Sequence, residues 1–189
     1  ELFRTVIWPR SLDLRCPIRR AGVDYVHQWL HEGLRYRGWI HRVGPVKLGI
    51  QGLHQAGNAA LACAAAESLC ASSFSVKAVH MAEGLHRARH PGRMEIHPAR
   101  IDPAGRRWPR VLLDGAHNPM AAQVLASQVK TYLPERPRVL LFSARPDKDV
   151  AAMMEALAPE VDRVVVTAIP DTPLPDLEVL SNVAHHHGA

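Results

Sequence analysis

The hydrophobic pattern in the second half of the chain alternates between short apolar runs and longer segments with helical spacing. The apolar runs predict strands at 94–101, 110–114, 138–144 and 163–169. Helical spacing occupies 119–133, 149–157 and 177–186, with Met153, Met154 and Leu157 on the inner face of the second segment. Apolar runs without polar alternation are typical of parallel strands covered on both faces. We therefore expect an α/β fold with a Rossmann-like, mostly parallel sheet and flanking helices.

The first half has a different texture. Residues 54–71 are rich in alanine and predict a helix whose small side chains permit close approach to a sheet. A second helix is expected at 76–88, capped by Ser75, with Val79, Ala82 and Leu85 on one face. Residues 1–51 favour short strands and turns with at most one brief helix. The Pro91-Gly92 pair breaks the chain, so we place a domain boundary there, between 1–91 and 92–189.

Composition narrows the class of protein. The chain is 47% hydrophobic and 22% charged, as globular proteins are, and has no apolar run near the ~20 residues of a membrane span. Its charge of +5 comes from scattered arginines with only 5% aromatic residues, which argues against nucleic-acid binding. Cys16, Cys63 and Cys70 lack the spacing of a disulfide framework and favour a reducing compartment, so we expect a cytoplasmic protein.

The 12 histidines raise the question of a metal site. His27 and His31 are four residues apart, a spacing that could chelate zinc on a helix, and His185, His186 and His187 are consecutive. Gln28 stands where the zinc protease motif has a glutamate. We interpret both groups as surface features and expect no metal site from them.

The run VLLDGAHNP at 111–119 carries the densest chemistry in the chain. It predicts a buried strand, a sharp turn and a helix start, which together bring Asp114, His117 and free backbone amides to one point. Asp114 could accept hydrogen bonds from ribose hydroxyls or cap the helix. His117 could bind phosphate oxygens or serve only the turn, which we expect Asn118 and Pro119 to shape.

Three further groups are candidate ligand contacts. The amide of Asn58 suits the edge of adenine, with a cap or turn role as the alternative. Arg93 follows the chain break and could fork onto phosphate oxygens, approaching from the neighbouring domain as the domains close; a surface ion pair is the alternative. Asp147 and Lys148 lie where ligand loops gather in α/β sheets, and Asp149 beside them could cap the next helix.

Four segments resemble one family. They are GLHQAGNAALA (52–62), HPGRME (90–95), VLLDGAHNP (111–119) and, more weakly, FSARPDKD (142–149). Their order and spacing are similar to the second half of folylpolyglutamate synthase and dihydrofolate synthase, among the Mur-ligase-like ATP-dependent amide ligases. The resemblance places Asn58 at adenine, Asp114 at ribose, and Arg93 and His117 at the phosphates as the catalytic pair. It also makes Asp147 and Lys148 candidates for substrate binding.

The resemblance implies a ligase that uses ATP and Mg²⁺ to add L-glutamate to dihydropteroate or folate through an acyl phosphate. The family's Gly-Lys-Thr/Ser phosphate loop is absent from these 189 residues, and its magnesium ligands precede the matched region. We therefore expect 1–91 to be the end of the central ATP-binding domain and 92–189 a truncated C-terminal domain, inactive alone. A monomer without nucleic-acid or membrane partners is expected. A cell-wall precursor ligase and a noncatalytic nucleotide-binding module are the alternatives.

Overall fold

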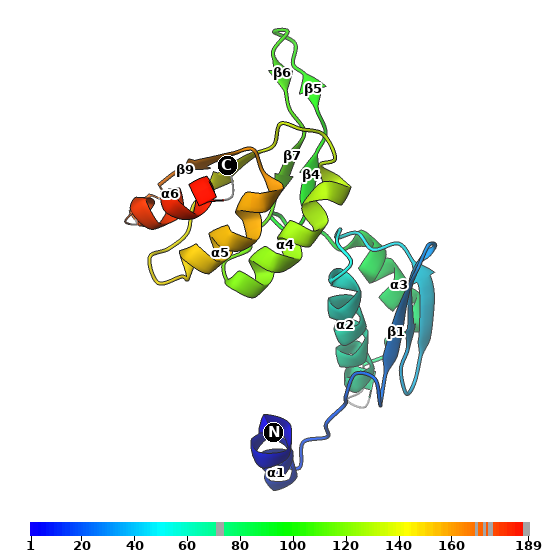
Figure 1. The fold of residues 1–189 in the computed structure, drawn as a ribbon. Helices are drawn as coiled ribbons and strands as arrows, with labels where there is room; N and C mark the ends of the chain where they lie inside the picture. The colour runs from blue at the N-terminus through cyan, green and yellow to red at the C-terminus, as the bar shows by residue number, and fades with distance from the viewer. Residues whose placement is uncertain (71–73, 169, 172, 174–175, 187–189) are drawn as a thin grey trace. The chain divides into compact units, whose positions relative to one another are not determined.

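Helices and strands make up two successive parts of the chain in this computed structural model, which describes residues 1–70, 74–168, 170–171, 173 and 176–186. These parts form two compact units, Glu1–Arg89 and His90–Ala189 (Figure 1). The expected α/β class is confirmed, since small sheets are flanked by helices. Within the described residues, no helix combines the length and the apolar character that a membrane span requires.

The first unit is built on a three-stranded antiparallel sheet. A π-helical turn at Phe3–Ile7 runs into the short helix α1 (Trp8–Asp13). The strands β1 (Val26–Leu30), β2 (Gly33–Arg37) and β3 (Arg42–Val46) follow, in that spatial order. Short strands with one brief helix were expected here and are confirmed. His27 lies on β1 and His31 in the turn that follows it, so a helical zinc-chelating pair is excluded.

Two helices cover one face of this sheet. They are α2 (Gln55–Cys70) and α3 (Ala78–Arg87). Ala60, Cys63 and Ala64 of α2 share a buried cluster with Tyr25 and Tyr36 of the sheet layer. Because alanine and cysteine are small, the helix backbone comes close to the two aromatic rings, and burial of this apolar area stabilises the unit. The close approach predicted from the alanine-rich sequence is confirmed.

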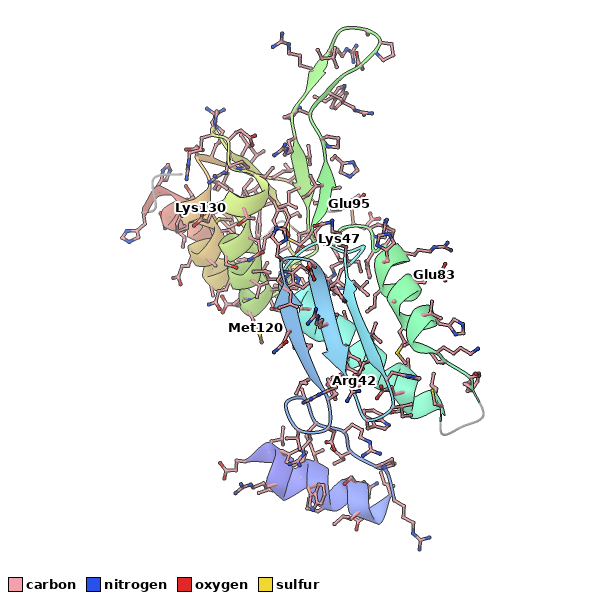
Figure 2. All side chains as sticks on the ribbon, turned by 90° about the vertical axis from the view of Figure 1, so that its right-hand side faces the viewer. Arg42, Lys47, Glu83, Glu95, Met120 and Lys130 are labelled. Carbon is pink, nitrogen blue, oxygen red and sulfur yellow. The ribbon has the colours of Figure 1, made fainter. Side chains whose placement is uncertain are left out.

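The helix α3 differs from its prediction at two points. Its N-cap is Lys77 rather than Ser75, because the helix starts at Ala78. Its fully buried residue is Met81, and Val79 is 63% exposed. Residues two apart on a helix point to opposite sides, so burial of Met81 turns Val79 outward. Glu83 projects from the outer face of α3 and pairs with Arg87 at 2.9 Å (Figure 2).

A buried carboxylate fastens the turn between β2 and β3 to α2. Glu67 is completely buried and accepts hydrogen bonds from the backbone N–H of Trp39 (3.1 Å) and of His41 (2.6 Å). Any side chain at Gly38 would collide with the Glu67 carboxylate. Burial, followed by the nearby Glu67 charge, raises the pKa of the Cys63 thiol to about 11. This contact fixes the helix that carries the GLHQAGNAALA motif at its start.

The described residues of the second unit form three short strand pairs and three α-helices. The strands are β4 (Glu95–His97), β5 (Arg100–Ile101), β6 (Arg107–Trp108), β7 (Val111–Leu113), β8 (Val139–Phe142) and β9 (Arg163–Val166). The helices are α4 (Pro119–Tyr132), α5 (Val150–Leu157), continued by a 3₁₀ turn at Ala158–Glu160, and α6 (Leu177–His186). Residues 71, 169 and 187, which belong to predicted features, lie outside the described residues.

Strand direction in this unit is mixed. β8 and β9 pair in parallel, as expected for strands joined by a helix. β4 and β7 pair antiparallel, as do β5 and β6, because the hairpin around 102–106 turns the chain straight back. Figure 1 shows β5 and β6 extending away from β4 and β7 as one long hairpin. The parallel arrangement is thus limited to β8 and β9 among the described strands.

The core of the second unit lies between β8, β9 and the helices. Its buried residues include Phe142, Met153, Met154, Leu157 and Leu180. The predicted inner face of α5 is therefore confirmed. The strands are covered on one face only among the described residues: Leu141 of β8 is 68% exposed, and Val111 and Leu113 of β7 are 37% and 44% exposed. The expectation of strands buried on both faces is wrong for this part of the chain.

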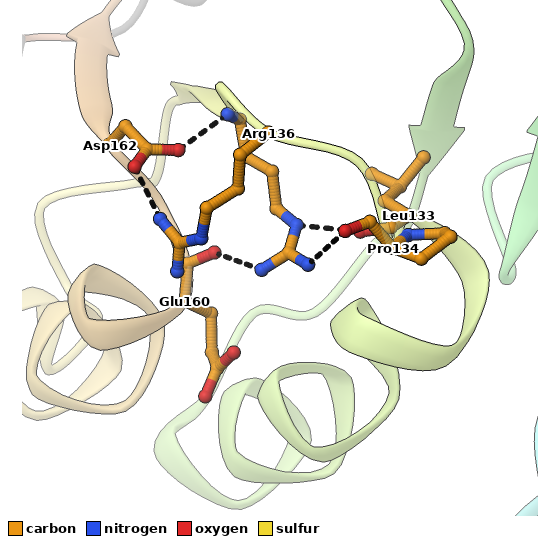
Figure 3. A network of polar contacts seen from close by, with 6 residues as sticks. Leu133, Pro134, Arg136, Glu160 and Asp162 are labelled. Atoms are coloured by element: carbon orange, nitrogen blue, oxygen red, sulfur yellow. Dashed lines mark hydrogen bonds and ion pairs between the residues drawn. The ribbon is translucent and has the colours of Figure 1, made fainter.

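A buried arginine links the residues that follow α4 to the end of the 3₁₀ turn in this unit (Figure 3). Arg138 is 8% exposed and donates from its guanidinium to the carbonyl oxygens of Leu133 (2.6 Å), Pro134 (3.1 Å) and Glu160 (3.1 Å). Its backbone N–H donates to Asp162 (2.6 Å). The guanidinium thereby satisfies carbonyl groups left free where α4 and the 3₁₀ turn end.

Candidate functional site

The β4–β7 ladder brings the HPGRME and DGAHNP segments together. Its register places Glu95 opposite Leu113. Beyond the ladder the two segments stay side by side but leave its register: the Gly115 N–H donates to the Gly92 carbonyl at 2.7 Å, whereas the register of the ladder would set Arg93 opposite Gly115. Two segments that are separate in the sequence therefore form one local structure.

Asp114 fastens this local structure with both carboxylate oxygens. Oδ2 accepts from the backbone N–H of Met94 and Oδ1 from that of Ala116, each at 2.9 Å. Asp114 does not cap the following helix. Asn118 does so, accepting from Ala121 N at 2.8 Å, and Pro119 is the first residue of α4. The helix-cap alternative for Asp114 is wrong, and the turn-shaping roles of Asn118 and Pro119 are confirmed.

The arginine loop has a sharply turned backbone. Met94 has a φ of 46° and a side chain only 1% exposed, and Gly92 has a φ of 68°. Left-handed backbone is rare for a methionine, and here burial and the hydrogen bond to Asp114 hold it in place. The turn directs Arg93 toward the DGAHNP segment: a guanidinium nitrogen lies 3.8 Å from the position that a Cβ on Gly115 would occupy.

The guanidinium of Arg93 is available for a ligand. In the described part of the chain, neither a hydrogen bond nor an ion pair involves it. The neighbouring Glu95 is engaged elsewhere, with the Gly92 N–H at 2.8 Å and His97 Nε2 at 3.1 Å. Arg93 belongs to the same unit as Asp114 and His117, so the expectation that it comes from a neighbouring domain is wrong.

His117 lies exposed on the same turn. Its Nδ1 is 3.0 Å from the Gly115 carbonyl oxygen. A carbonyl only accepts, so Nδ1 carries the proton of this hydrogen bond and Nε2 is left to face solvent or a ligand. The structure therefore gathers three of the predicted residues, Arg93, Asp114 and His117, around Gly115.

Asn58 lies in the first unit, near the start of α2. Its Nδ2 donates to Gln55 Oε1 at 3.0 Å, and Gln55 Nε2 is 2.9 Å from His54 Nε2. Gln55 is only 9% exposed, whereas Asn58 is exposed. Sequence reasoning missed Gln55. The available signal was a polar side chain on the face of α2 where Ala56, Ala59 and Ala60 are buried.

Asp147 and Lys148 occupy the loop between β8 and α5. Lys148 Nζ donates to Asp147 Oδ2 at 2.8 Å, and Arg145 lies 3.3 Å from the other oxygen. The hydrogen bond from Lys148 is the main cause that lowers the pKa of the Asp147 carboxyl. Asp149 caps α5 by accepting a hydrogen bond from the Ala152 N–H, which confirms the capping role considered for it in the sequence. No described contact joins this loop to Arg93.

The described residues offer no cluster of three or more His, Cys, Asp or Glu side chains that could hold a metal ion. His185 and His186 lie on the last turn of α6.

Comparison with known proteins assigns the family. Residues 92–187, which are just over half of the chain, match the model of the Mur ligase, glutamate ligase domain. The chain therefore belongs to the Mur ligase family. It is 33% identical over 141 residues to the dihydrofolate synthase/folylpolyglutamate synthase of Mycobacterium tuberculosis, which covers 74% of this chain and 27% of that protein.

Solved structures agree with this assignment. Mycobacterium tuberculosis folylpolyglutamate synthase complexed with ADP superposes with a TM-score of 0.76 and 28% identity, covering 98% of this chain and 40% of that one. E. coli FolC in complex with DHPP and ADP gives a TM-score of 0.74 and 26% identity, covering 95% and 40%. The chain thus spans about two fifths of the length of these structures and about a quarter of the curated M. tuberculosis relative.

Proposed function

We propose that this chain is part of an ATP-dependent ligase that adds L-glutamate to dihydropteroate or folate. The observation that carries the proposal is the position of Arg93: its guanidinium has no described partner and lies beside the turn that bears His117. A free guanidinium and an exposed imidazole at one turn suit a phosphate group. The similar proteins named for folate ligation, including structures holding ADP, support the same reading.

In this proposal, Arg93 and His117 are the catalytic residues. Arg93 would fork onto phosphate oxygens. His117, when protonated, would donate from Nε2, because Nδ1 is already used on the Gly115 carbonyl. Asp114 would hold the ribose. Each of its oxygens accepts one backbone N–H and keeps a lone pair for a hydroxyl group. Asn58 would contact the adenine base.

The proposed reaction has two steps. A carboxylate oxygen of the folate-type substrate would attack the γ-phosphorus of ATP, and the bond from that phosphorus to the bridging oxygen breaks and releases ADP. The neutral amine of glutamate would then attack the acyl carbon, the bond from that carbon to the phosphate oxygen would break, and inorganic phosphate would leave with the proton that the nitrogen gives up as the amide forms. Arg93 and His117 would stabilise phosphate charge in both steps by positioning and electrostatics, without a covalent bond to the protein.

The two proposed domains of the chain would have different functions. We propose that 1–91 is the end of a central ATP-binding domain and that 92–189 is a Mur-type C-terminal domain, with the family match at 92–187 in support. Asp147 and Lys148 are proposed to contact substrate. ATP would enter as its magnesium complex, and no residue of this chain is assigned to the metal. A monomer in the cytoplasm remains the expectation.

A second candidate is a noncatalytic nucleotide-binding module, because a free guanidinium beside an exposed imidazole would also suit phosphate binding without turnover. One experiment separates the two. Incorporation of glutamate is measured in the presence of ATP with dihydropteroate, reduced folates or cell-wall precursors, using the full-length protein that contains this chain and residues 1–189 alone.

Turnover of a folate-type substrate by the full-length protein supports the ligase. Turnover of a cell-wall precursor instead would move the chain to the other branch of the family. We expect no turnover by residues 1–189 alone. Activity of that piece would contradict the proposed division of labour, and nucleotide binding without any turnover by the longer protein would favour the noncatalytic module.

A further inference from the structure

A chain of three hydrogen-bonded side chains stands at the start of α2. Asn58 Nδ2 donates to Gln55 Oε1 at 3.0 Å, and Gln55 Nε2 lies 2.9 Å from His54 Nε2. The middle member is the buried one, with Gln55 only 9% exposed. Turning over the buried Gln55 amide by itself would lose both hydrogen bonds, because each of its atoms would then face a group of its own kind.

The direction of the hydrogen bonds in this chain is fixed. The Nε2 amide group of Gln55 can only donate, so the His54 ring nitrogen accepts. The Oε1 atom of Gln55 can only accept, so Asn58 must present its NH₂ group to Gln55. This leaves Asn58 with a free Oδ1 acceptor and one remaining N–H. Asn58 is exposed, and within the described residues only the hydrogen bond to Gln55 engages its amide.

We propose that Gln55 is a positioning residue that orients the Asn58 amide and thereby makes the nucleotide site prefer adenine over guanine. The inference rests on the proposed contact of Asn58 with the base. Adenine exposes an N6 donor beside the N7 acceptor, which complements a free Oδ1 and one N–H. Guanine exposes two acceptors, O6 and N7, on the same edge.

The hydrogen bond between Asn58 and Gln55 is what strengthens the preference for adenine over guanine. With guanine bound, O6 would face Asn58 Oδ1 and no hydrogen bond could form. Turning the Asn58 amide over would relieve that contact, but it would set Oδ1 against Gln55 Oε1, two acceptors without a proton between them. Removal of the Gln55 amide takes this second penalty away and lets Asn58 adapt to either base.

The test compares ATP and GTP as substrates of the full-length protein. Gln55→Met keeps the length of the side chain and removes both hydrogen bonds. Gln55→Glu is the matched control, because a carboxylate still accepts from Asn58 Nδ2. We expect Gln55→Met to lower the ratio of kcat/KM for ATP to that for GTP by roughly tenfold, since one net hydrogen bond corresponds to about that factor. Gln55→Glu should keep most of the ratio. A purely structural role would change both substrates equally.

Asn58→Ala separates this inference from the proposed function. If Asn58→Ala weakens use of ATP while Gln55→Met leaves the ratio unchanged, the positioning role is overturned and the nucleoside site stands. If Asn58→Ala leaves ATP kinetics unchanged, the base contact itself is refuted, and the inference with it. Should Gln55→Met not fold, His54→Ala at the exposed end of the chain frees Gln55 Nε2 and must lower the ratio in the same direction; an unchanged ratio there overturns the proposal.

Discussion

The side chain of Asp114 accepts a hydrogen bond from the backbone N–H of Met94, with 2.9 Å between the nitrogen and Oδ2. This single contact joins the loop that carries Arg93 to the turn that carries His117. It holds Met94 in its left-handed backbone conformation and leaves Asp114 with both a structural and a proposed ligand-binding role. Experiments on this residue must therefore measure stability and activity together.

Replacement of Asp114 by alanine should weaken both properties. The N–H groups of Met94 and Ala116 lose their acceptor, which should lower stability. We expect kcat/KM for ATP to decrease by an amount that corresponds to ~1–3 kcal/mol, the range for losing a charged hydrogen-bond partner. Steady-state kinetics with the full-length protein and urea unfolding of the same variant are the measurements. Normal ATP kinetics would count against the ribose contact.

Asp102 provides the matched control for Asp114. It also accepts two backbone N–H groups, those of Ala104 and Arg106, but in the hairpin between β5 and β6. Asp102→Ala should therefore loosen the hairpin and leave ATP kinetics unchanged. Equal losses in the two variants would mean that Asp114 acts only through local structure.

Arg93 should matter for activity far more than for folding. Its guanidinium makes no described hydrogen bond or ion pair, so Arg93→Ala should leave the urea midpoint nearly unchanged. Loss of a group that stabilises phosphate charge should lower kcat by roughly a hundredfold. Arg93→Lys keeps the positive charge but cannot donate two parallel hydrogen bonds to a phosphate, so it should recover only part of the rate. Arg106→Ala, at an exposed arginine of the hairpin, is the control and should change neither kcat nor the urea midpoint.

Arg138 should behave in the opposite way. Arg138→Met leaves the carbonyl oxygens of Leu133, Pro134 and Glu160 without their donor in a buried place. We expect the free energy of unfolding to fall by about 3 kcal/mol, measured by urea denaturation. Arg163→Met, at an exposed position on β9, should change it little. A stability loss no larger than that of the control would show that water replaces the guanidinium.

Asp162 links this arginine network to pH. The backbone N–H of Arg138, followed by Arg136, lowers the pKa of the Asp162 carboxyl. A depressed carboxyl pKa in the folded state adds stability that is present above the ordinary pKa and is lost as the pH falls through the folded value. Between about pH 6 and about pH 3, Asp162→Asn should therefore lose less stability than the unchanged chain. Parallel losses in urea titrations at both pH values would refute this.

The thiols should differ sharply in reactivity. Burial and the Glu67 charge raise the pKa of Cys63 to about 11, so almost no thiolate forms near neutral pH. Cys16 is free and exposed. We expect an alkylating reagent to modify Cys16 quickly in the folded chain and Cys63 only after unfolding, as followed by mass spectrometry of peptides. Rapid modification of Cys63 in native conditions would contradict the packing of α2 against the sheet.

The helices of the second unit show what sequence alone could predict. Apolar periodicity is a local property, and it located α4, α5 and α6 to within a residue or two and identified Met153, Met154 and Leu157 as core. Short motifs likewise identified Asn118 as a residue that shapes the turn before α4 and offered Asp149 as a cap of α5, and the structure confirms both. Such features depend on residues that are close together in the chain, so they can be predicted from a short stretch of sequence.

Strand register and the burial of polar groups required the tertiary structure. Nothing in the sequence around Arg93 says that its guanidinium will lie beside Gly115, because that depends on how the pairing of β4 with β7 brings the two segments together. The buried Glu67 and Arg138 escaped prediction for the same reason: Glu67 bonds to His41 and Arg138 to Glu160, far away in the chain, and a polar side chain is buried only where such partners satisfy it. The sequence determined the motifs and the helices, and long-range pairing decided which of the motif residues meet.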